Sequence, residues 1–315
     1  MVSVYEMQAG SRSLTETGDI REGVWINLEN PSDKEIEEIN AKTGIPEDML
    51  KAALDEEERA HIDIDDGCTL IIVDIPIISE SDDTGDWYQY STLPMGIVYN
   101  DGYFVTVCLR ETAVLSDFIR GRVRGFDVNK KTRFIYQILY VNATKYLHFL
   151  KQIDKTSNRV QTKLHKSMKN KELIQLLDLE KALVYFSTSL NSNQIVIERL
   201  KALSTLKHYD DDNDIIDDVI IENKQAIEMA TIYRDIMSGT MDAFASVISN
   251  NQNIVMKLLA AMTICLTIPS VISGLWGMNV AVPLQDYSWA FWVIVGIVVA
   301  ILIPVIIVMV RKKMF

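Results

Sequence analysis

A ladder of small and polar residues follows one face of a helix that the sequence predicts in its last third. Alternate steps of four and three residues from Asp242 to Gly277 meet only one large apolar side chain, Met256. Such steps average 3.5 residues per turn, so the series would face the axis of a left-handed helix bundle. That axis would be polar. The series consists of Asp242, Ser246, Ser249, Asn253, Met256, Ala260, Thr263, Thr267, Ser270, Gly274 and Gly277.

Two explanations of this ladder are open. A water-soluble coiled coil would place Leu and Ile on the seam, and a lipid-facing anchor needs no row of Ser and Thr. A pore built from several copies of the chain does need one. Close packing between membrane helices also enriches Gly, Ala, Ser and Thr. We favour the pore.

The helix that carries the ladder is predicted to enter a membrane. Two apolar runs, 258–276 and 289–310, contain no charged residue and flank a polar loop. Each is close to the roughly 20 residues that a helix needs to cross the hydrocarbon core. Aromatic residues around the loop and basic residues beyond the runs place the loop outside the cell. Both chain ends would then be cytosolic, in a multi-pass protein of the cell membrane.

The ladder ends at the motif Gly277-Met278-Asn279, where the first apolar run would reach the outer face. With Trp276 before it and a second span after it, the motif resembles the signature of the CorA family of magnesium channels. The resemblance covers essentially the whole chain and is strongest from about residue 230 onward. It implies a homopentamer with a funnel-shaped cytosolic domain and five copies of the first span around the pore.

The resemblance also implies roles for residues along the pore. Gly277, Met278 and Asn279 would form the selectivity filter. Mg²⁺ gives up its water reluctantly, so a ring of neutral Asn279 amides could bind the hydrated ion weakly enough to release it. Met256 and Leu259 match the hydrophobic constriction at the inner end. The other expected pore residues are Asn253, Ala260, Thr263, Thr267, Ser270 and Gly274, with Asp242 and Ser249 at the stalk entrance and a basic ring of Lys257, Arg311, Lys312 and Lys313.

In the family that this chain resembles, Mg²⁺ bound between cytosolic domains holds the pore shut. By this resemblance, Asp218 matches one acidic residue of that site. The second acidic residue could be Glu80, Asp82 or Asp83. A cation between like-charged subunits would offset carboxylate repulsion, so its loss would bias the pore toward opening. Mg²⁺ is therefore expected both as transported ion and as regulator.

The first two thirds of the chain predict a separate α/β domain followed by long helices. Runs rich in β-formers at 68–78, 93–99 and 103–109 alternate with helical stretches such as 32–40 and 47–54. The expected fold class is an α+β and α-helical membrane protein, with an N-terminal α/β cytosolic domain, a helical hairpin and a long stalk helix that continues into the first span. We divide it into an α/β domain (1–130), an antiparallel hairpin (131–208), a cytosolic stalk (209–257), a pore-lining span (258–276), an extracellular loop (277–288), a second span (289–310) and a basic cytosolic tail (311–315).

The tip of the predicted hairpin is basic, with Lys163, Lys166, Lys169 and Lys171 close together in sequence. A charge run is usually a solvated face. The alternative is that this tip lies near anionic lipid headgroups, which would make membrane lipid a partner.

The overall charge excludes some functions. The formal net charge is -12, and residues 1–129 alone carry more negative charge than the whole chain. This argues against nucleic acid as a partner, since a nucleic-acid binder would show a basic footprint. The 4 histidines are scattered, and no HExxH, Walker A or nucleophile–base arrangement occurs. The sequence therefore predicts no enzyme.

The expected function is passive uptake of hydrated Mg²⁺, driven by the membrane potential and gated by intracellular Mg²⁺, with Co²⁺ and Ni²⁺ as further possible substrates. Zinc transport, as in the ZntB relatives, is an alternative, although they tend to alter the central residue of the motif and Met278 favours magnesium. A membrane-anchored sensor or scaffold that does not conduct is the alternative from another class.

Overall fold

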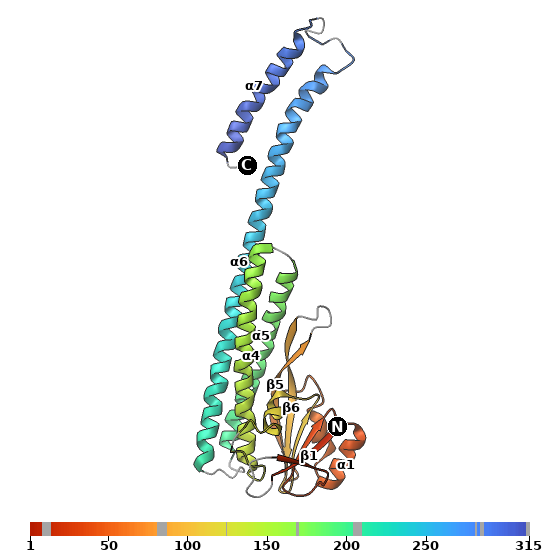
Figure 1. Ribbon diagram of the computed structural model, residues 1–315, viewed down its shortest axis with the longest axis vertical. Helices are drawn as coiled ribbons and strands as arrows, with labels where there is room; N and C mark the ends of the chain where they lie inside the picture. The colour runs from red at the N-terminus through yellow and green to blue at the C-terminus, as the bar shows by residue number, and fades with distance from the viewer. Residues whose placement is uncertain are drawn as a thin grey trace. The chain divides into compact units, whose positions relative to one another are not determined.

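The computed structural model of the 315-residue chain describes residues 1–7, 14–80, 87–123, 125–167, 170–203, 210–280, 282–283 and 287–312. The chain divides into two compact units, Met1–Gly239 and Thr240–Phe315. The first unit contains a seven-stranded sheet and long helices that pack against it (Figure 1). The second contains the C-terminal part of the helix α6 (Asp210–Trp276) and the helix α7 (Ala290–Arg311).

The sheet has the strand order β2-β1-β3-β7-β6-β5-β4. Strands β3 and β7 pair in parallel, and the other neighbours pair antiparallel. The two longest strands, β5 and β6, form a hairpin that continues past the ends of the other strands (Figure 1). The strands are β1 (Val2–Met7), β2 (Leu14–Thr17), β3 (Trp25–Glu29), β4 (His61–Asp65), β5 (Cys68–Glu80), β6 (Tyr88–Tyr99) and β7 (Phe104–Cys108).

Side chains that alternate along the strands form two cores, one on each face of the sheet. Ile26, Leu70 and Ile72 pack with the short helices α1 (Asp33–Thr43) and α2 (Glu47–Ala52). Their neighbours Trp25 and Ile71 point to the opposite face. That face packs against α3 (Ala113–Ile119), α4 (Lys131–Ser167), α5 (Asn170–Ala202) and the start of α6.

Local signals fix where α1 begins and ends. The Ser32 hydroxyl accepts from the Glu35 backbone N–H, and the Glu35 carboxylate accepts from the Ser32 backbone N–H at 2.8 Å, which completes a capping box. Gly44 ends the helix with φ +71°, a conformation that costs a residue with a side chain more than it costs glycine. These caps hold α1 over its face of the sheet.

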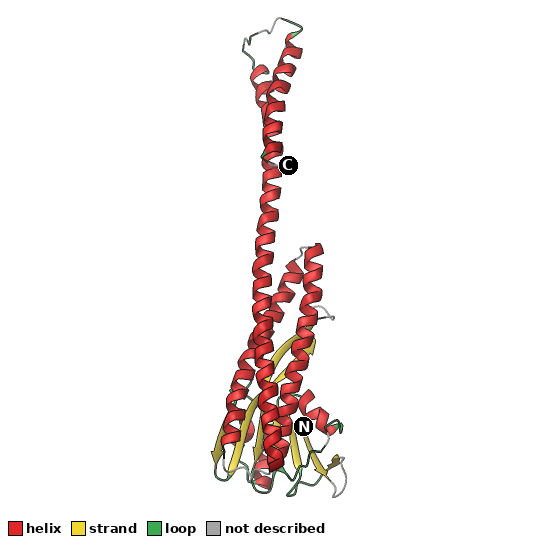
Figure 2. Ribbon diagram, turned by 90° about the vertical axis from the view of Figure 1, so that its left-hand side faces the viewer, coloured by secondary structure: helices red, strands yellow, loops and turns green. Residues whose placement is uncertain are grey.

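The helices α4, α5 and the first-unit part of α6 run side by side, with the sheet against one end of them (Figure 2). Buried amides join them to each other and to the sheet. Asn193 of α5 exchanges two hydrogen bonds of 2.8 Å with the backbone of Asp74 in β5. Asn142 of α4 donates to the same Asp74 carbonyl at 2.9 Å. Asn223 of α6 donates to the Leu190 carbonyl of α5 at 3.1 Å.

The second unit consists of two apolar helices joined by the loop that follows Trp276. The helix α6 continues unbroken to that residue, through Pro269, and α7 contains Pro304. Both helices are long and apolar enough to cross a membrane, with mean hydropathies of 2.0 and 3.4 in their most apolar windows, and only 6% of each window is buried. Within this chain they are therefore not buried as core helices are.

The predicted fold class is confirmed in its N-terminal α/β domain, its long helices and its two apolar C-terminal helices. The structure adds strands β1 to β4 and helix α3, which the sequence did not predict. The homopentameric funnel stays a prediction, because the structure contains one chain.

Candidate functional site

The predicted ladder lies on α6 as far as Gly274, and its last member, Gly277, follows the end of the helix; all of its members are exposed. Met256 and Leu259, the expected constriction, are 64% and 53% exposed. Asn253, between the stalk and the span, is exposed as well. With Ile254, Val255 and Leu258 they form a run of exposed apolar side chains, and such a run marks a surface that a partner or lipid covers. The described part of the second unit supplies no such cover.

The hydroxyl groups of the ladder share one geometry. Thr263 Oγ1 donates to the Leu259 carbonyl at 2.8 Å, Thr267 Oγ1 to the Thr263 carbonyl at 2.7 Å, and Ser270 Oγ to the Leu266 carbonyl at 2.9 Å. Each hydroxyl proton is thus used within its own helix. The oxygen lone pairs remain, so each hydroxyl presents an acceptor to its surroundings. Acceptors in a row suit the water shell of a cation.

The helix ends at the predicted filter motif. The Gly277 N–H donates to the Ser273 carbonyl at 2.9 Å, which closes the last turn. A Cβ at Gly277 would lie 3.2 Å from that same carbonyl oxygen, which is a close contact. Gly277 therefore permits a tight helix end. Met278 and Asn279 follow it and are exposed.

Charged residues flank the membrane helices as the sequence predicted. Lys257 lies on α6 before the apolar run, and Arg311 and Lys312 lie at the end of α7; all three are exposed. Lys313, the fourth member of the predicted basic ring, lies outside the described residues. Whether these side chains form a ring stays a prediction, because a ring requires several copies.

The proposed regulatory carboxylate, Asp218, is exposed on α6 within the first unit. Of its possible partners, Glu80 ends β5 but its side chain is not described, and Asp82 and Asp83 lie outside the described residues. Within the described ranges, no three His, Cys, Asp or Glu side chains come together as a metal site. A site shared between copies of the chain stays a prediction.

Near the start of α6, one aspartate is buried. Asp212 is 1% exposed, and its Oδ1 lies 4.0 Å from Arg133 Nε of α4. Burial raises the pKa of the neighbouring Tyr136 hydroxyl, and the Asp212 charge raises it further. Further along the helix, Asp217 forms an exposed ion pair with Lys201. These charged groups lie where the start of α6 meets α4 and α5.

Sequence reasoning missed two polar features of the first unit. One is Asp74, whose pKa burial raises to about 6, an effect that a hydrogen bond from Ser189 partly offsets. The other is a cavity beside the hairpin tip, lined by Trp87 and Arg159 as well as by two of the predicted tip lysines. No linear pattern marks either, because strand and helix residues far apart in sequence build them.

Comparison with known proteins agrees with the features of α6 and α7. The family model described as "CorA-like Mg2+ transporter protein" matches residues 21–312. The chain belongs to this family. It is therefore a membrane transporter of divalent cations and not an enzyme.

Individual relatives extend this comparison. The cobalt/magnesium transport protein CorA of Methanocaldococcus jannaschii is 27% identical over 291 residues, 89% of this chain and 87% of the relative. The complete structure of the CorA magnesium transporter from that organism has a TM-score of 0.80 at 23% identity, covering 98% of this chain and 96% of that one. The full-length CmaX protein has a TM-score of 0.67 at 16% identity, over 98% and 96% of the two chains. Likenesses at these identities show the shared fold alone.

Proposed function

We propose that this CorA-family chain conducts hydrated Mg²⁺ passively into the cell through a pore that several copies line with α6. The observation that carries the proposal is the row of hydroxyl acceptors on α6 that ends at Gly277-Met278-Asn279. Co²⁺ and Ni²⁺ are further expected substrates. The cobalt/magnesium transport function of the relative from Methanocaldococcus jannaschii supports the choice of ion.

The chemistry of the row suits a hydrated ion. Mg²⁺ dehydrates reluctantly, so a conducting site gains by accepting hydrogen bonds from the ion's waters. Thr263, Thr267 and Ser270 have already given their protons to the backbone and can accept from those waters. The Asn279 amide oxygen adds a neutral acceptor at the outer end. Neutral ligands hold the ion weakly enough for release, unlike a ring of carboxylates.

The driving force is the membrane potential together with the concentration gradient. Two elementary charges crossing 100 mV, negative inside, release about 4.6 kcal/mol. This favours inward movement. The sequence contains no Walker A motif for nucleotide hydrolysis, so the proposed transport uses no chemical energy.

Assembly and regulation complete the proposal. Five copies around one axis would place the Met256 and Leu259 side chains at a narrow apolar constriction, which can gate by dewetting. Lys257, Arg311 and Lys312 would surround the cytosolic end, with both termini in the cytosol. Intracellular Mg²⁺ bound at Asp218, with a partner acid of another copy, would stabilise the closed state.

The test is Mg²⁺ influx into liposomes that contain the purified protein, with internal Mg²⁺ varied. Asn279→Ala removes the amide acceptor and should abolish influx. Asn250→Ala is the matched control, since Asn250 is an exposed amide on α6 one position away from the ladder. The control should retain influx, and internal Mg²⁺ should suppress the influx of the wild type.

The same assay separates the alternatives. Zn²⁺ influx that exceeds Mg²⁺ influx would identify a zinc transporter. Background flux for every ion, from protein with an intact fold, would refute conduction and favour a sensor or scaffold. Equal loss of influx in Asn279→Ala and Asn250→Ala would refute the proposed role of the motif.

A further inference from the structure

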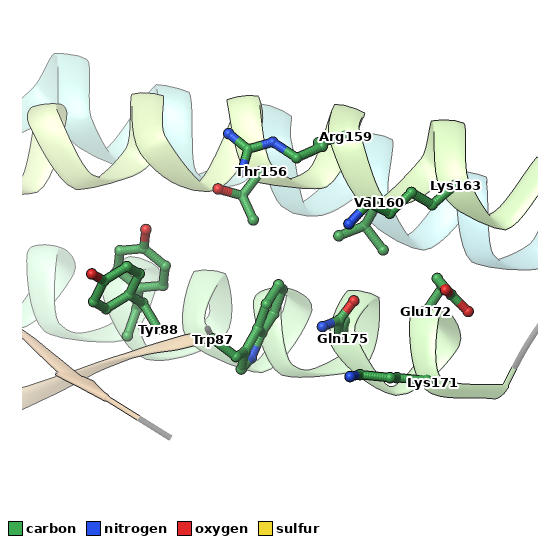
Figure 3. A pocket seen from close by; sticks show the side chains of 10 residues that line it. Trp87, Tyr88, Thr156, Arg159, Val160, Lys163, Lys171, Glu172 and Gln175 are labelled. Carbon is green, nitrogen blue, oxygen red and sulfur yellow. The ribbon is translucent and has the colours of Figure 1, made fainter. Parts of the chain in front are cut away.

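A cavity of about 300 Å³ lies between the ends of α4 and α5 and the start of β6 (Figure 3). Arg159 and Lys163 reach it from α4, and Lys171 reaches it from α5. Trp87 and Tyr88 enter it from the strand side, between the two helices (Figure 3). Its volume lies within the range of small-molecule sites. All of these residues belong to the first unit, and none lies on the proposed ion path.

The cavity is positively charged in a chain whose net charge is -12. Among the described residues that line it, three are cations, Arg159, Lys163 and Lys171, and one is a carboxylate, Glu172, so their formal charge is three minus one, or +2. In the part of the chain that the structure describes, neither Arg159 nor Lys171 has a carboxylate within ion-pair distance. A dianion would therefore neutralise this lining.

Two buried polar atoms of the lining have no hydrogen-bond partner in the described structure, Trp87 Nε1 and Glu172 Oε2. A buried donor or acceptor left alone costs free energy, and native proteins pair almost all of them. Trp87 Nε1 requires an acceptor, and Glu172 Oε2 requires a donor. A negatively charged ligand with both an acceptor and a donor group would give each of these two atoms a hydrogen-bond partner.

Aromatic side chains make up the strand side of the cavity. Trp87, Tyr88 and Tyr90 line it, and Tyr88 is 54% exposed. Nucleic-acid bases stack favourably on aromatic side chains. Basic side chains opposite aromatic ones are thus suited to an aromatic base linked to phosphate.

We propose that this cavity binds a nucleoside phosphate. Arg159, Lys163 and Lys171 would hold the phosphate oxygens through charge-assisted hydrogen bonds. The aromatic wall would stack the base, Trp87 Nε1 would donate to a ligand oxygen, and Glu172 would accept from an amino or hydroxyl group. A phosphate monoester is close to a dianion at neutral pH, which matches the charge of the lining.

The test is calorimetric titration of the full-length protein in detergent with AMP and ATP, at constant free Mg²⁺. Saturable binding of either is expected. The double substitution Arg159→Gln with Lys171→Gln should weaken it by about tenfold or more, since both side chains are exposed and their loss removes charged bonds without unfolding the helices. Trp87→Phe retains a ring but loses the donor, and should weaken binding by about fivefold.

Matched controls decide the result. Lys151→Gln with Lys224→Gln makes the same charge change at exposed helical positions outside the cavity and should leave binding unchanged. Inorganic phosphate and adenosine, each alone, should bind at least about tenfold more weakly than AMP. No saturable binding up to about 1 mM of either nucleotide, phosphate binding as tight as AMP binding, or equal loss in the control would overturn the proposal. The readout is independent of ion flux and of the proposed transport.

Discussion

Replacing Asp74 with asparagine should stabilise the protein at neutral pH. Asp74 lies in β5, where α4 and α5 pack on the sheet and the amides of Asn142 and Asn193 bind its backbone. Burial raises the pKa of its carboxyl from 3.8 to about 6, and a hydrogen bond from Ser189 lowers it by less. The carboxylate is therefore held in surroundings that favour its neutral form.

The magnitude follows from the difference between the two pKa values. The folded-state pKa of about 6 lies roughly two pH units above 3.8, and each pH unit corresponds to about 1.36 kcal/mol, so ionisation of Asp74 in the fold costs about 3 kcal/mol. Below about pH 4 the group is protonated in both states and this cost is absent. As pH rises through the folded-state pKa of about 6, the carboxyl ionises in the fold, and the protein loses the free energy of unfolding that this group contributed at low pH. An asparagine side chain cannot ionise, so Asp74→Asn should escape this loss.

The assay is the thermal unfolding midpoint of the full-length protein in detergent between pH 4 and 8. At pH 7.5 Asp74→Asn should raise the midpoint by roughly 4–6 °C, and the difference should nearly vanish at about pH 4. Asp65→Asn is the control, because Asp65 is exposed on the edge strand β4, and its midpoint should follow the wild type. A difference that is the same at every pH, or a destabilised variant at pH 7.5, would refute the reasoning.

Three further predictions concern ion conduction, each measured as Mg²⁺ influx into liposomes. Thr267→Val preserves shape but removes the acceptor oxygen, and should lower influx by about 2–10-fold, whereas Thr267→Ser should retain it. Gly277→Ala places a Cβ 3.2 Å from the Ser273 carbonyl oxygen and should reduce influx, because that close contact must shift the last turn before the motif. Asp218→Asn should relieve inhibition by internal Mg²⁺, while the exposed Asp214→Asn should not; normal inhibition in Asp218→Asn would exclude the assigned site.

The long helices and the membrane segments could be predicted because their signals are local. Apolar residues recur at helical spacing through α4 and α5, and an uncharged run of about 20 residues is sufficient to predict a span. The motif Gly277-Met278-Asn279 is visible in the sequence for the same reason, since its three residues are adjacent, and its role as a filter stays a prediction. The helix that carries the ladder could therefore be predicted from the sequence of α6 alone.

The missed elements depend on contacts that sequence does not display. Strand β4 reads His61-Ile62-Asp63-Ile64-Asp65, and its acids are tolerated because it is the edge of the sheet, with most of its side chains exposed. The raised pKa of Asp74 requires two helices that begin more than 50 residues later to cover β5. The cavity likewise depends on tertiary packing, because it brings Trp87 together with Arg159 of α4. Tertiary packing creates these features, so no local period could predict them.

The two kinds of surface on α6 explain why one copy of the chain is not the proposed working unit. Lipid can cover exposed apolar side chains such as Leu266 and Val271, which are 71% and 53% exposed. Lipid cannot favour the acceptor oxygens of Thr263 and Thr267, because hydrocarbon offers them no donor. An arrangement in which the apolar sides face lipid and the ladders face one another around water covers both surfaces. The ladder thus argues for an assembly of copies as well as for a path, and a hydrated divalent cation supplies the donors that its oxygen atoms lack.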